Sequence, residues 1–130
     1  MEKRKYIRED INRKALFYIQ GAEFGRVEFS GITKNISECG MAIEICGDRD
    51  IDIAGGANVG DVIKFVIVDE FEYMFEKRDW CVSGKAKVIR MEYNEDKLII
   101  GCEFSNLPYD VEEYIVAKKV VTFQSNGYQI

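Results

Sequence analysis

Apolar residues recur at every second position over much of the chain from residue 15 onward. These alternating segments lie at 15–19, 27–29, 41–45, 63–67, 86–88 and 98–104. A spacing of two places the apolar side chains on one face of a strand, and many of the positions between them are polar. Sequences rich in Gly, Asn and Asp separate the segments and indicate turns. The pattern therefore predicts about six strands, most with one face toward water, as in antiparallel sheets.

The pattern changes after Pro108, the one proline of the chain. Beyond it, Asp110 and the Glu113 that follows three residues later resemble a capping box. Apolar residues then recur at helical spacing, namely Val111, Tyr114, Ala117 and Val121. We therefore expect a helix over residues 109–123.

The number of strands suggests how the sheet is arranged. An open sheet of six strands has two exposed edges, whereas a closed barrel has none. The predicted fold is all-β with a C-terminal helix: a six-stranded antiparallel β-barrel with the helix packed against it. Residues 69–79 mix charged and aromatic side chains. Two alternatives remain open for them, an extension of two strands into a long hairpin or a protruding loop.

Composition indicates one soluble domain. The chain has 130 residues, of which 47% are apolar and 32% are charged. Its apolar runs are far shorter than the ~18 residues that span a bilayer, so no membrane insertion is expected. Residues 1–10 include several basic side chains but no apolar stretch follows them, unlike a secretory signal. These features favour a cytoplasmic protein.

The sequence lacks the residues that most catalytic and metal sites use. It contains no histidine, which removes Ser-His and Cys-His nucleophile pairs together with the commonest metal ligand. The four cysteines, Cys39, Cys46, Cys81 and Cys102, form no CxxC pair, and we expect them to be reduced thiols. Cys46 and Cys102 lie in apolar segments, where we expect them to pack. The chain is therefore predicted to be no enzyme, with no metal site and no cofactor.

Charge is distributed unevenly along the chain. Residues 1–14 contain six basic and three acidic side chains, a net charge of +3, whereas the remaining residues have a net charge of −8. An acidic body repels a long polyanion, so we expect no DNA binding. A short basic segment is still able to neutralise a small ligand with two or so phosphates. A compact anion is therefore the favoured ligand class.

Two short motifs occur in this chain. Arg4-Lys-Tyr-Ile-Arg8 has the form RxxxR and follows Lys3, and Asn35-Ile-Ser-Glu-Cys-Gly40 has the form (D/N)xSxxG. Each motif alone is common, but their order, their separation and a β-rich domain of this length together resemble the signature of PilZ domains. The segment Ile100-Gly-Cys-Glu-Phe104, with a helix after it, also resembles the end of such domains. The resemblance covers essentially the whole chain and implies a six-stranded barrel that binds the bacterial second messenger cyclic di-GMP.

The arginines of the first motif suit this ligand. The guanidinium groups of Arg4 and Arg8 stay charged at physiological pH and are able to grip phosphate oxygens or the O6/N7 edge of guanine, a contact worth ~1–3 kcal/mol. Being four residues apart, they share one side if the segment is helical, or straddle the ligand if it is extended. Lys3 stands where the family's choice of residue is associated with ligand stoichiometry. Lys3 either contacts the ligand or is a solvated charge.

The second motif supplies hydrogen-bond acceptors, which the arginines lack. In the family's pattern the position of Asn35 faces the guanine, and its side-chain oxygen accepts from a base N–H, less strongly than the aspartate that the family also allows. Ser37 hydrogen-bonds a base or a phosphate. Gly40 has no Cβ, which permits a positive φ and a close approach of backbone or ligand. The predicted ligand-binding residues are thus Arg4, Arg8, Asn35, Ser37 and Gly40, with Lys3 as a further candidate.

The expected organisation is a flexible basic arm over residues 1–13 that carries RxxxR, followed by barrel and helix over residues 14–130. Cyclic di-GMP would order the arm and so change the surface offered to a protein partner, in motility, polysaccharide or secretion machinery by resemblance. The oligomeric state, monomer or dimer, stays open. Two alternatives also remain: a degenerate PilZ-like adaptor that acts by protein contacts without nucleotide, and a small-barrel binder of single-stranded nucleic acid.

Overall fold

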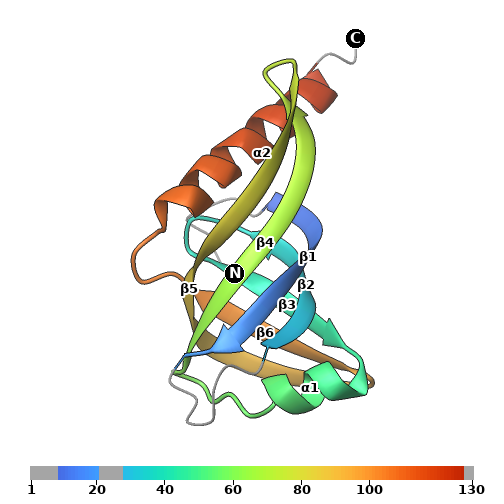
Figure 1. Ribbon diagram of the computed structural model, residues 1–130, viewed down its shortest axis with the longest axis vertical. Helices are drawn as coiled ribbons and strands as arrows, with labels where there is room; N and C mark the ends of the chain where they lie inside the picture. Colours follow the sequence, from blue (N-terminus) through green and yellow to red (C-terminus); the bar gives the residue numbers. More distant parts are fainter. Residues whose placement is uncertain (1–8, 21–27, 128–130) are drawn as a thin grey trace, which may run out of the picture.

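Six antiparallel strands form a closed barrel (Figure 1). The structure is a computed structural model and describes residues 9–20 and 28–127. Its elements are β1 (Glu9–Ile19), β2 (Glu28–Ile36), β3 (Gly40–Cys46), α1 (Asp48–Ala54), β4 (Val62–Tyr73), β5 (Glu76–Asn94), β6 (Lys97–Glu103) and α2 (Tyr109–Gly127). Around the barrel the strands follow the order β1-β2-β3-β6-β5-β4, and β4 pairs with β1. The predicted all-β class, the six-stranded barrel and the C-terminal helix are confirmed.

Apolar residues that alternate along the strands fill the barrel. Phe17 of β1 lies opposite Phe29 of β2 and Phe65 of β4, and its ring stacks on that of Phe29 with 5.4 Å between the centroids. Burial of such a side chain contributes about 1.5–3 kcal/mol. The same interior contains these fully buried residues: Ile36, Ile43, Ile45, Ile63, Ile67, Leu98 and Ile100.

β1 begins at Glu9, which corrects the predicted boundary of the arm. Residues 9–13 belong to the strand, where Glu9 lies opposite Ile36 of β2. A β-bulge around Asn12, whose φ is 49°, interrupts the pairing, and asparagine tolerates this left-handed conformation better than most residues. Ile11 is buried in step with the alternation at residues 15 and 17, but the charged Arg13 stands between Ile11 and Ala15 and interrupts the apolar pattern. A pattern of period two therefore does not detect the first part of the strand.

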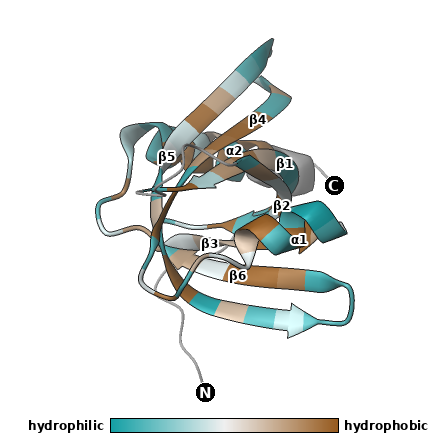
Figure 2. Cartoon of the chain, turned by 60° about the horizontal axis from the view of Figure 1, so that its bottom comes forward, coloured by the Kyte–Doolittle hydropathy of each residue, from teal (hydrophilic) through white to brown (hydrophobic). Residues whose placement is uncertain are grey.

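β4 and β5 continue beyond the barrel as a long hairpin, so the hairpin alternative for residues 69–79 is correct. Figure 2 shows the hairpin projecting away from the barrel. Pairing runs without interruption from Val62 opposite Lys87 up to a two-residue turn, Met74 and Phe75. Their φ values of 54° and 67° are typical of a type I′ turn, which usually contains Asn and Gly. Phe75 is 94% exposed at the tip.

α2 packs along this hairpin (Figure 1). It begins directly after Pro108, as predicted, and continues past the predicted end at residue 123. Asp110 lies in the first helical turn, so the cap position predicted for it is wrong. Tyr114 of α2 is fully buried, and its ring contacts those of Phe71 and Trp80 on the hairpin. These aromatic contacts attach the helix to the part of the sheet that leaves the barrel.

The sequence pattern does not predict α1, which has only seven residues. This helix packs against β2 and β3. The carboxylate of Asp50 accepts hydrogen bonds from the backbone N–H of Ser30 at 3.1 Å and from its hydroxyl at 3.3 Å. Within residues 9–20 and 28–127, no helix is both long enough and apolar enough to cross a membrane.

Candidate functional site

A tight turn joins β2 to β3 and contains Ser37 and Gly40 of the second motif. The Ser37 N–H donates to the Gly40 carbonyl at 2.9 Å. The Cys39 N–H donates to the hydroxyl oxygen of Ser37 at 3.2 Å, which holds the buried Ser37 side chain over the turn. Because the oxygen acts as the acceptor here, the hydroxyl keeps its own hydrogen for a further bond.

Asn35 lies near the end of β2, directly before Ile36 and this turn. A β-bulge between Thr33 and Asn35 shifts the register with β3, so Asn35 lies opposite Ala42 on that side and opposite Asp10 of β1 on the other. Directly opposed residues of antiparallel strands project from the same face of the sheet. The Asn35 amide and the Asp10 carboxylate therefore share one face. Only the strand pairing reveals Asp10, because neither motif contains it.

Gly40 is required for a close approach of β6. It lies opposite Glu103 in the register, and a Cβ at this position would overlap the carbonyl oxygen of Cys102. Among the described glycines, positive φ values occur at Gly47 and Gly60 and not at Gly40. Of the two properties predicted for Gly40, the close approach is confirmed and the positive φ is wrong. The group that approaches is protein backbone.

The RxxxR motif and Lys3 lie outside the described residues, so the roles predicted for Arg4, Arg8 and Lys3 stay predictions. The structure does place Glu9, the residue that follows the motif in the sequence. Glu9 lies opposite Ile36, which is part of the second motif. The described end of β1 therefore lies beside the turn that contains Ser37 and Gly40.

The turn is also connected to α2. The ammonium group of Lys119 donates to Oε1 of Glu38 at 2.7 Å. Burial raises the pKa of Glu38, but the hydrogen bond from Lys119 and its charge act in the opposite direction, and the pKa is lowered from its usual value. Since Glu38 belongs to the second motif, this ion pair attaches the motif directly to the helix.

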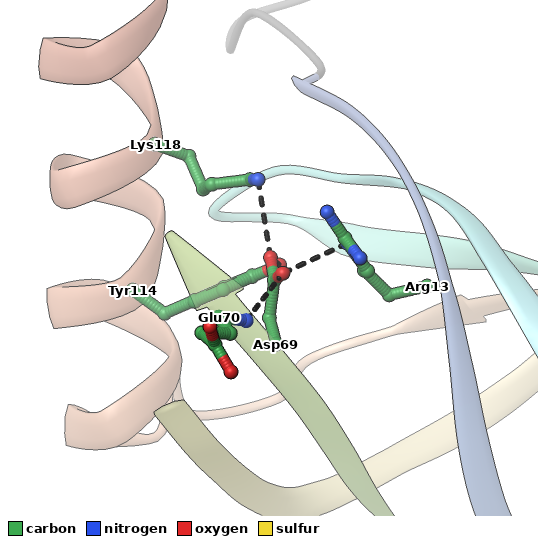
Figure 3. Close-up of polar contacts among 5 residues, drawn as sticks. All are labelled: Arg13, Asp69, Glu70, Tyr114 and Lys118. Atoms are coloured by element: carbon green, nitrogen blue, oxygen red, sulfur yellow. Dashed lines mark hydrogen bonds and ion pairs between the residues drawn. The ribbon is translucent and has the colours of Figure 1, made fainter. Parts of the chain in front are cut away.

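A second connection joins β1 to α2 through the buried carboxylate of Asp69 on β4 (Figure 3). Its side chain has 0% exposure. Oδ1 accepts from Nε of Arg13 at 2.8 Å and from the Glu70 N–H at 2.7 Å. Oδ2 accepts from the Tyr114 hydroxyl at 2.7 Å and from the Lys118 ammonium at 3.1 Å. Four donors thus compensate a charge that would otherwise be costly to bury.

The Tyr114 hydroxyl stays protonated in this arrangement. Burial raises the pKa of Tyr114 well above its usual value, and the hydrogen bond to Asp69 raises it further. The phenol is therefore a permanent donor to the carboxylate at physiological pH. Arg13 of β1 and Tyr114 and Lys118 of α2 are held by one side chain of β4.

A pocket of about 430 Å3 lies where β5 separates from β6. Lys87 lies opposite Glu103 of β6, which lies opposite Gly40 of β3. Two strand spacings, about 10 Å, therefore separate one side of the pocket from the turn. The volume is within the range of small-molecule sites. Its lining consists of Val62, Gly84, Lys85, Ala86, Lys87, Ser105, Asn106 and Pro108.

The cysteines and carboxylates of the described residues form no group of three or more that is able to hold a metal ion. All four cysteines are free thiols. Cys102 is buried as predicted, but the packing predicted for Cys46 is wrong, because this residue ends β3 and is exposed. What the turn and its neighbours offer a ligand is hydrogen bonding by a hydroxyl, an amide and a carboxylate.

Known proteins resemble this chain in fold and not in sequence. No family model and no curated protein matches the sequence. The structure is similar to that of the inhibitor of motility MotI/DgrA from Bacillus subtilis, with a TM-score of 0.60 and 19% identity. That match covers 99% of this chain and 55% of the other, so the chain spans about half the length of MotI/DgrA.

The structure is also similar to the PilZ domain of YcgR from Escherichia coli, which was solved with c-di-GMP. The TM-score is 0.56 and the identity 9%, and the match covers 98% of this chain and 99% of the other. At such identities the likeness concerns the fold. The chain therefore has the fold of a PilZ domain, as the two motifs and their spacing predicted.

Proposed function

We propose that the chain is a non-catalytic receptor that binds cyclic di-GMP and passes the signal to a protein partner. The PilZ domain of YcgR, which has this fold, was solved with the same nucleotide. The turn between β2 and β3 supplies hydrogen-bonding groups, and the basic motif supplies the positive charge that two phosphodiesters require. The proposed ligand-binding residues are Arg4, Arg8, Asn35, Ser37 and Gly40, with Lys3 beside them.

The pairing of Glu9 with Ile36 is the observation that carries this proposal. A peptide bond joins Arg8 to Glu9 and keeps their Cα atoms about 3.8 Å apart. The described start of β1, which follows the basic motif in the sequence, therefore lies beside the second motif, although the two motifs are far apart in the sequence. A ligand between them is contacted by both motifs without any rearrangement of the barrel.

Asp10 adds a stronger acceptor to the site. A carboxylate accepts from the N–H groups of a guanine edge more strongly than an amide does. Asn35 stands where PilZ domains also allow aspartate, and the exposed Asp10 lies directly opposite it. We assign Asp10 to the guanine edge together with Asn35, while the arginines take the phosphates or the opposite edge of the base.

Two contacts link the proposed site to α2. Lys119 binds Glu38 in the second motif, and the adjacent Lys118 binds Asp69, which also holds Arg13 of β1. Ordering the residues before β1 costs about 1–2 kcal/mol for each residue, which the ligand contacts must exceed. A ligand that orders this segment and shifts the turn changes both attachments of the helix. α2 is therefore the described element through which binding changes the surface seen by a partner.

Isothermal titration with cyclic di-GMP tests the receptor function. We expect binding by the wild-type chain and a loss of roughly 5-fold to 150-fold in affinity for Arg8→Ala, since a good arginine contact is worth ~1–3 kcal/mol. Arg49→Ala is the matched control, because this exposed arginine lies on α1 and pairs with Asp50. No heat at tens of micromolar protein, or equal affinities for Arg8→Ala and the wild type, would refute the proposal.

A titration with cyclic di-AMP tests how the bases are recognised. This nucleotide has the same phosphates but lacks the N–H donors of the guanine edge. We expect wild-type protein to prefer cyclic di-GMP and Asp10→Ala to lose part of that preference. If Asp10→Ala binds both nucleotides as the wild type does, Asp10 is not part of the base contact.

An adaptor that acts by protein contacts alone is the alternative, and the hairpin tip favours it. Met74 and Phe75 expose apolar side chains in a left-handed turn that most residues avoid. Such a tip suits insertion into an apolar pocket of a protein partner. A chain that gives no heat with cyclic di-GMP but binds one specific partner, and loses that partner in Phe75→Ser, would support the adaptor.

A further inference from the structure

Four lysines without ion pairs lie on the outer surface of β1, β4 and β5. They are Lys14, Lys64, Lys85 and Lys87, and none pairs with a carboxylate of the described residues. Every other lysine and arginine with a described side chain forms such a pair. Among the described side chains, the unpaired positive charges are therefore concentrated on one part of a protein whose net charge is −5.

The strand registers place these lysines side by side. Lys64 lies directly opposite Lys85, and like charges in opposed positions destabilise a sheet. The strand segments 14–18, 62–68 and 81–87 contain no acidic residue. Among the described residues, a carboxylate lies outside these segments, at Glu103 of β6 opposite Lys87. The arrangement costs the isolated fold some stability, which a bound anion would offset.

Exposed apolar side chains lie among the lysines. Leu16 is 52% exposed and Val68 is 63% exposed. In the registers, Leu16 of β1 lies opposite Val66 of β4, and Val68 lies opposite Cys81 of β5. We name Lys14, Lys64, Lys85, Lys87, Leu16 and Val68 the lysine face. It combines positive charge with exposed apolar side chains.

We propose that the lysine face binds the surface of a membrane that contains acidic phospholipids. Lysines near such a surface attract its headgroups, and apolar side chains between them enter the interfacial region. Specific protein interfaces are instead depleted of lysine and enriched in arginine and aromatic residues, and the lysine face has no arginine. Single-stranded nucleic acid requires open aromatic rings for stacking, but Lys64 covers the ring of Tyr18, with 5.6 Å between Nζ and the ring centroid.

The negative net charge of the chain does not prevent this contact. Charges separated by more than about 8 Å of physiological salt solution are largely screened, so the membrane responds mainly to the lysine face. β4 and β3 lie on opposite sides of the ring of strands. Lys64 of β4 is therefore separate from the turn that we assign to the nucleotide, and the inference goes beyond the proposed function.

Co-sedimentation with vesicles tests this proposal. We expect the wild-type chain to bind phosphatidylcholine vesicles that contain about 30% phosphatidylglycerol, to bind pure phosphatidylcholine much less, and to dissociate as salt rises from about 0.1 M to 0.5 M. Lys85→Glu is expected to weaken binding roughly 25-fold, since each of the two units of charge changes it about fivefold. Arg49→Glu on α1 makes the same change in net charge and should bind as the wild type does.

Lys85→Glu also separates binding from folding. It places a carboxylate opposite Lys64, so its midpoint of thermal unfolding should equal or exceed that of the wild type. A stable Lys85→Glu variant that has lost vesicle binding supports the proposal. Equal binding by wild type, Lys85→Glu and Arg49→Glu would overturn it, as would no preference for acidic vesicles. Binding of a single-stranded oligonucleotide that depends on Lys85, without binding to vesicles, would overturn the choice of a membrane.

Discussion

Replacement of Asp69 by alanine should destabilise the protein more than any change of a neighbouring surface charge. In the wild-type chain its carboxylate accepts from four donors on three elements of the fold. Asp69→Ala removes all four bonds while the donors stay in place. The two donors on α2, Lys118 and Tyr114, then face a site without an acceptor.

The structure gives the magnitude of this effect. The Lys118 side chain is only 15% exposed, and the Tyr114 hydroxyl lies in the interior. Removal of one partner from a buried ion pair costs about 3–5 kcal/mol, because the other charge stays buried without compensation. Arg13 is exposed enough to reach water and adds little. A domain of ordinary stability has about 5–15 kcal/mol, so Asp69→Ala should remove a large part of it.

Urea unfolding monitored by tryptophan fluorescence measures this loss. Trp80 is the only tryptophan of the chain, and its ring stacks on Phe71 with 5.3 Å between the centroids. It also contacts Tyr114, so its emission reports on the attachment of α2. Glu70→Ala is the control, because Glu70 follows Asp69 directly but forms an ion pair with Lys77 on the surface, where water and salt screen the charges and little stability is gained.

A double-mutant cycle with Lys118→Met tests the cause. If the buried ammonium is responsible, Asp69→Ala should cost less in the Lys118→Met background, with a coupling energy of about 0.5–3 kcal/mol. A loss for Asp69→Ala no larger than that for Glu70→Ala would refute the account of the buried carboxylate. Strict additivity with Lys118→Met would show that the ammonium group plays no part in it.

A pH series and two sets of substitutions test other features. Burial raises the pKa of the Cys102 thiol from 9.0 to about 12. The contribution of the thiol to the free energy of unfolding is therefore complete below pH 9, and above pH 9 it falls by about 1.4 kcal/mol per pH unit. Urea titrations should show that stability falls less between about pH 8 and pH 10 in Cys102→Ala than in the wild type. The Thr33 hydroxyl is buried with no partner among the described residues, so Thr33→Val should raise the free energy of unfolding by about 1 kcal/mol, and a lower urea midpoint would contradict this. Met74→Asn combined with Phe75→Gly should stabilise the hairpin by about 2 kcal/mol, and an unchanged thermal midpoint would show that the left-handed turn carries no strain.

Strands with regular alternation could be predicted from the sequence, and irregular ones could not. The segments around Phe17, Phe65 and Ile100 alternate because each is buried on one face in the barrel. The start of β1 escaped prediction because Arg13, which pairs with the buried Asp69, stands between Ile11 and Ala15 where the alternation requires an apolar residue. The hairpin stayed undecided because its turn has Met74 and an aromatic residue in place of the Asn-Gly that usually indicates a type I′ turn.

The candidate site could be predicted only as far as local sequence determines it. Ser37 and Gly40 lie in one turn, as a motif of six consecutive residues allows. The contacts of Asp10 with β2 and of Glu38 with Lys119 depend on strand pairing and on the docking of a helix from the far end of the chain. Asp69 likewise sits in an apolar strand pattern, and its partners come from two other elements.

The hairpin has a further consequence for the solubility of the chain. In the described part, residues 68–73 of β4 pair only with residues 76–81, and residues 76–86 of β5 pair with no strand except β4, so both edges of this ribbon expose unpaired backbone N–H and C=O groups. Charged side chains such as Lys77 and Arg78 discourage the addition of another strand there. α2 shields the aromatic side of the ribbon. A chain cut before Tyr109 would lose that shield, and its ribbons would tend to join edge to edge into aggregates.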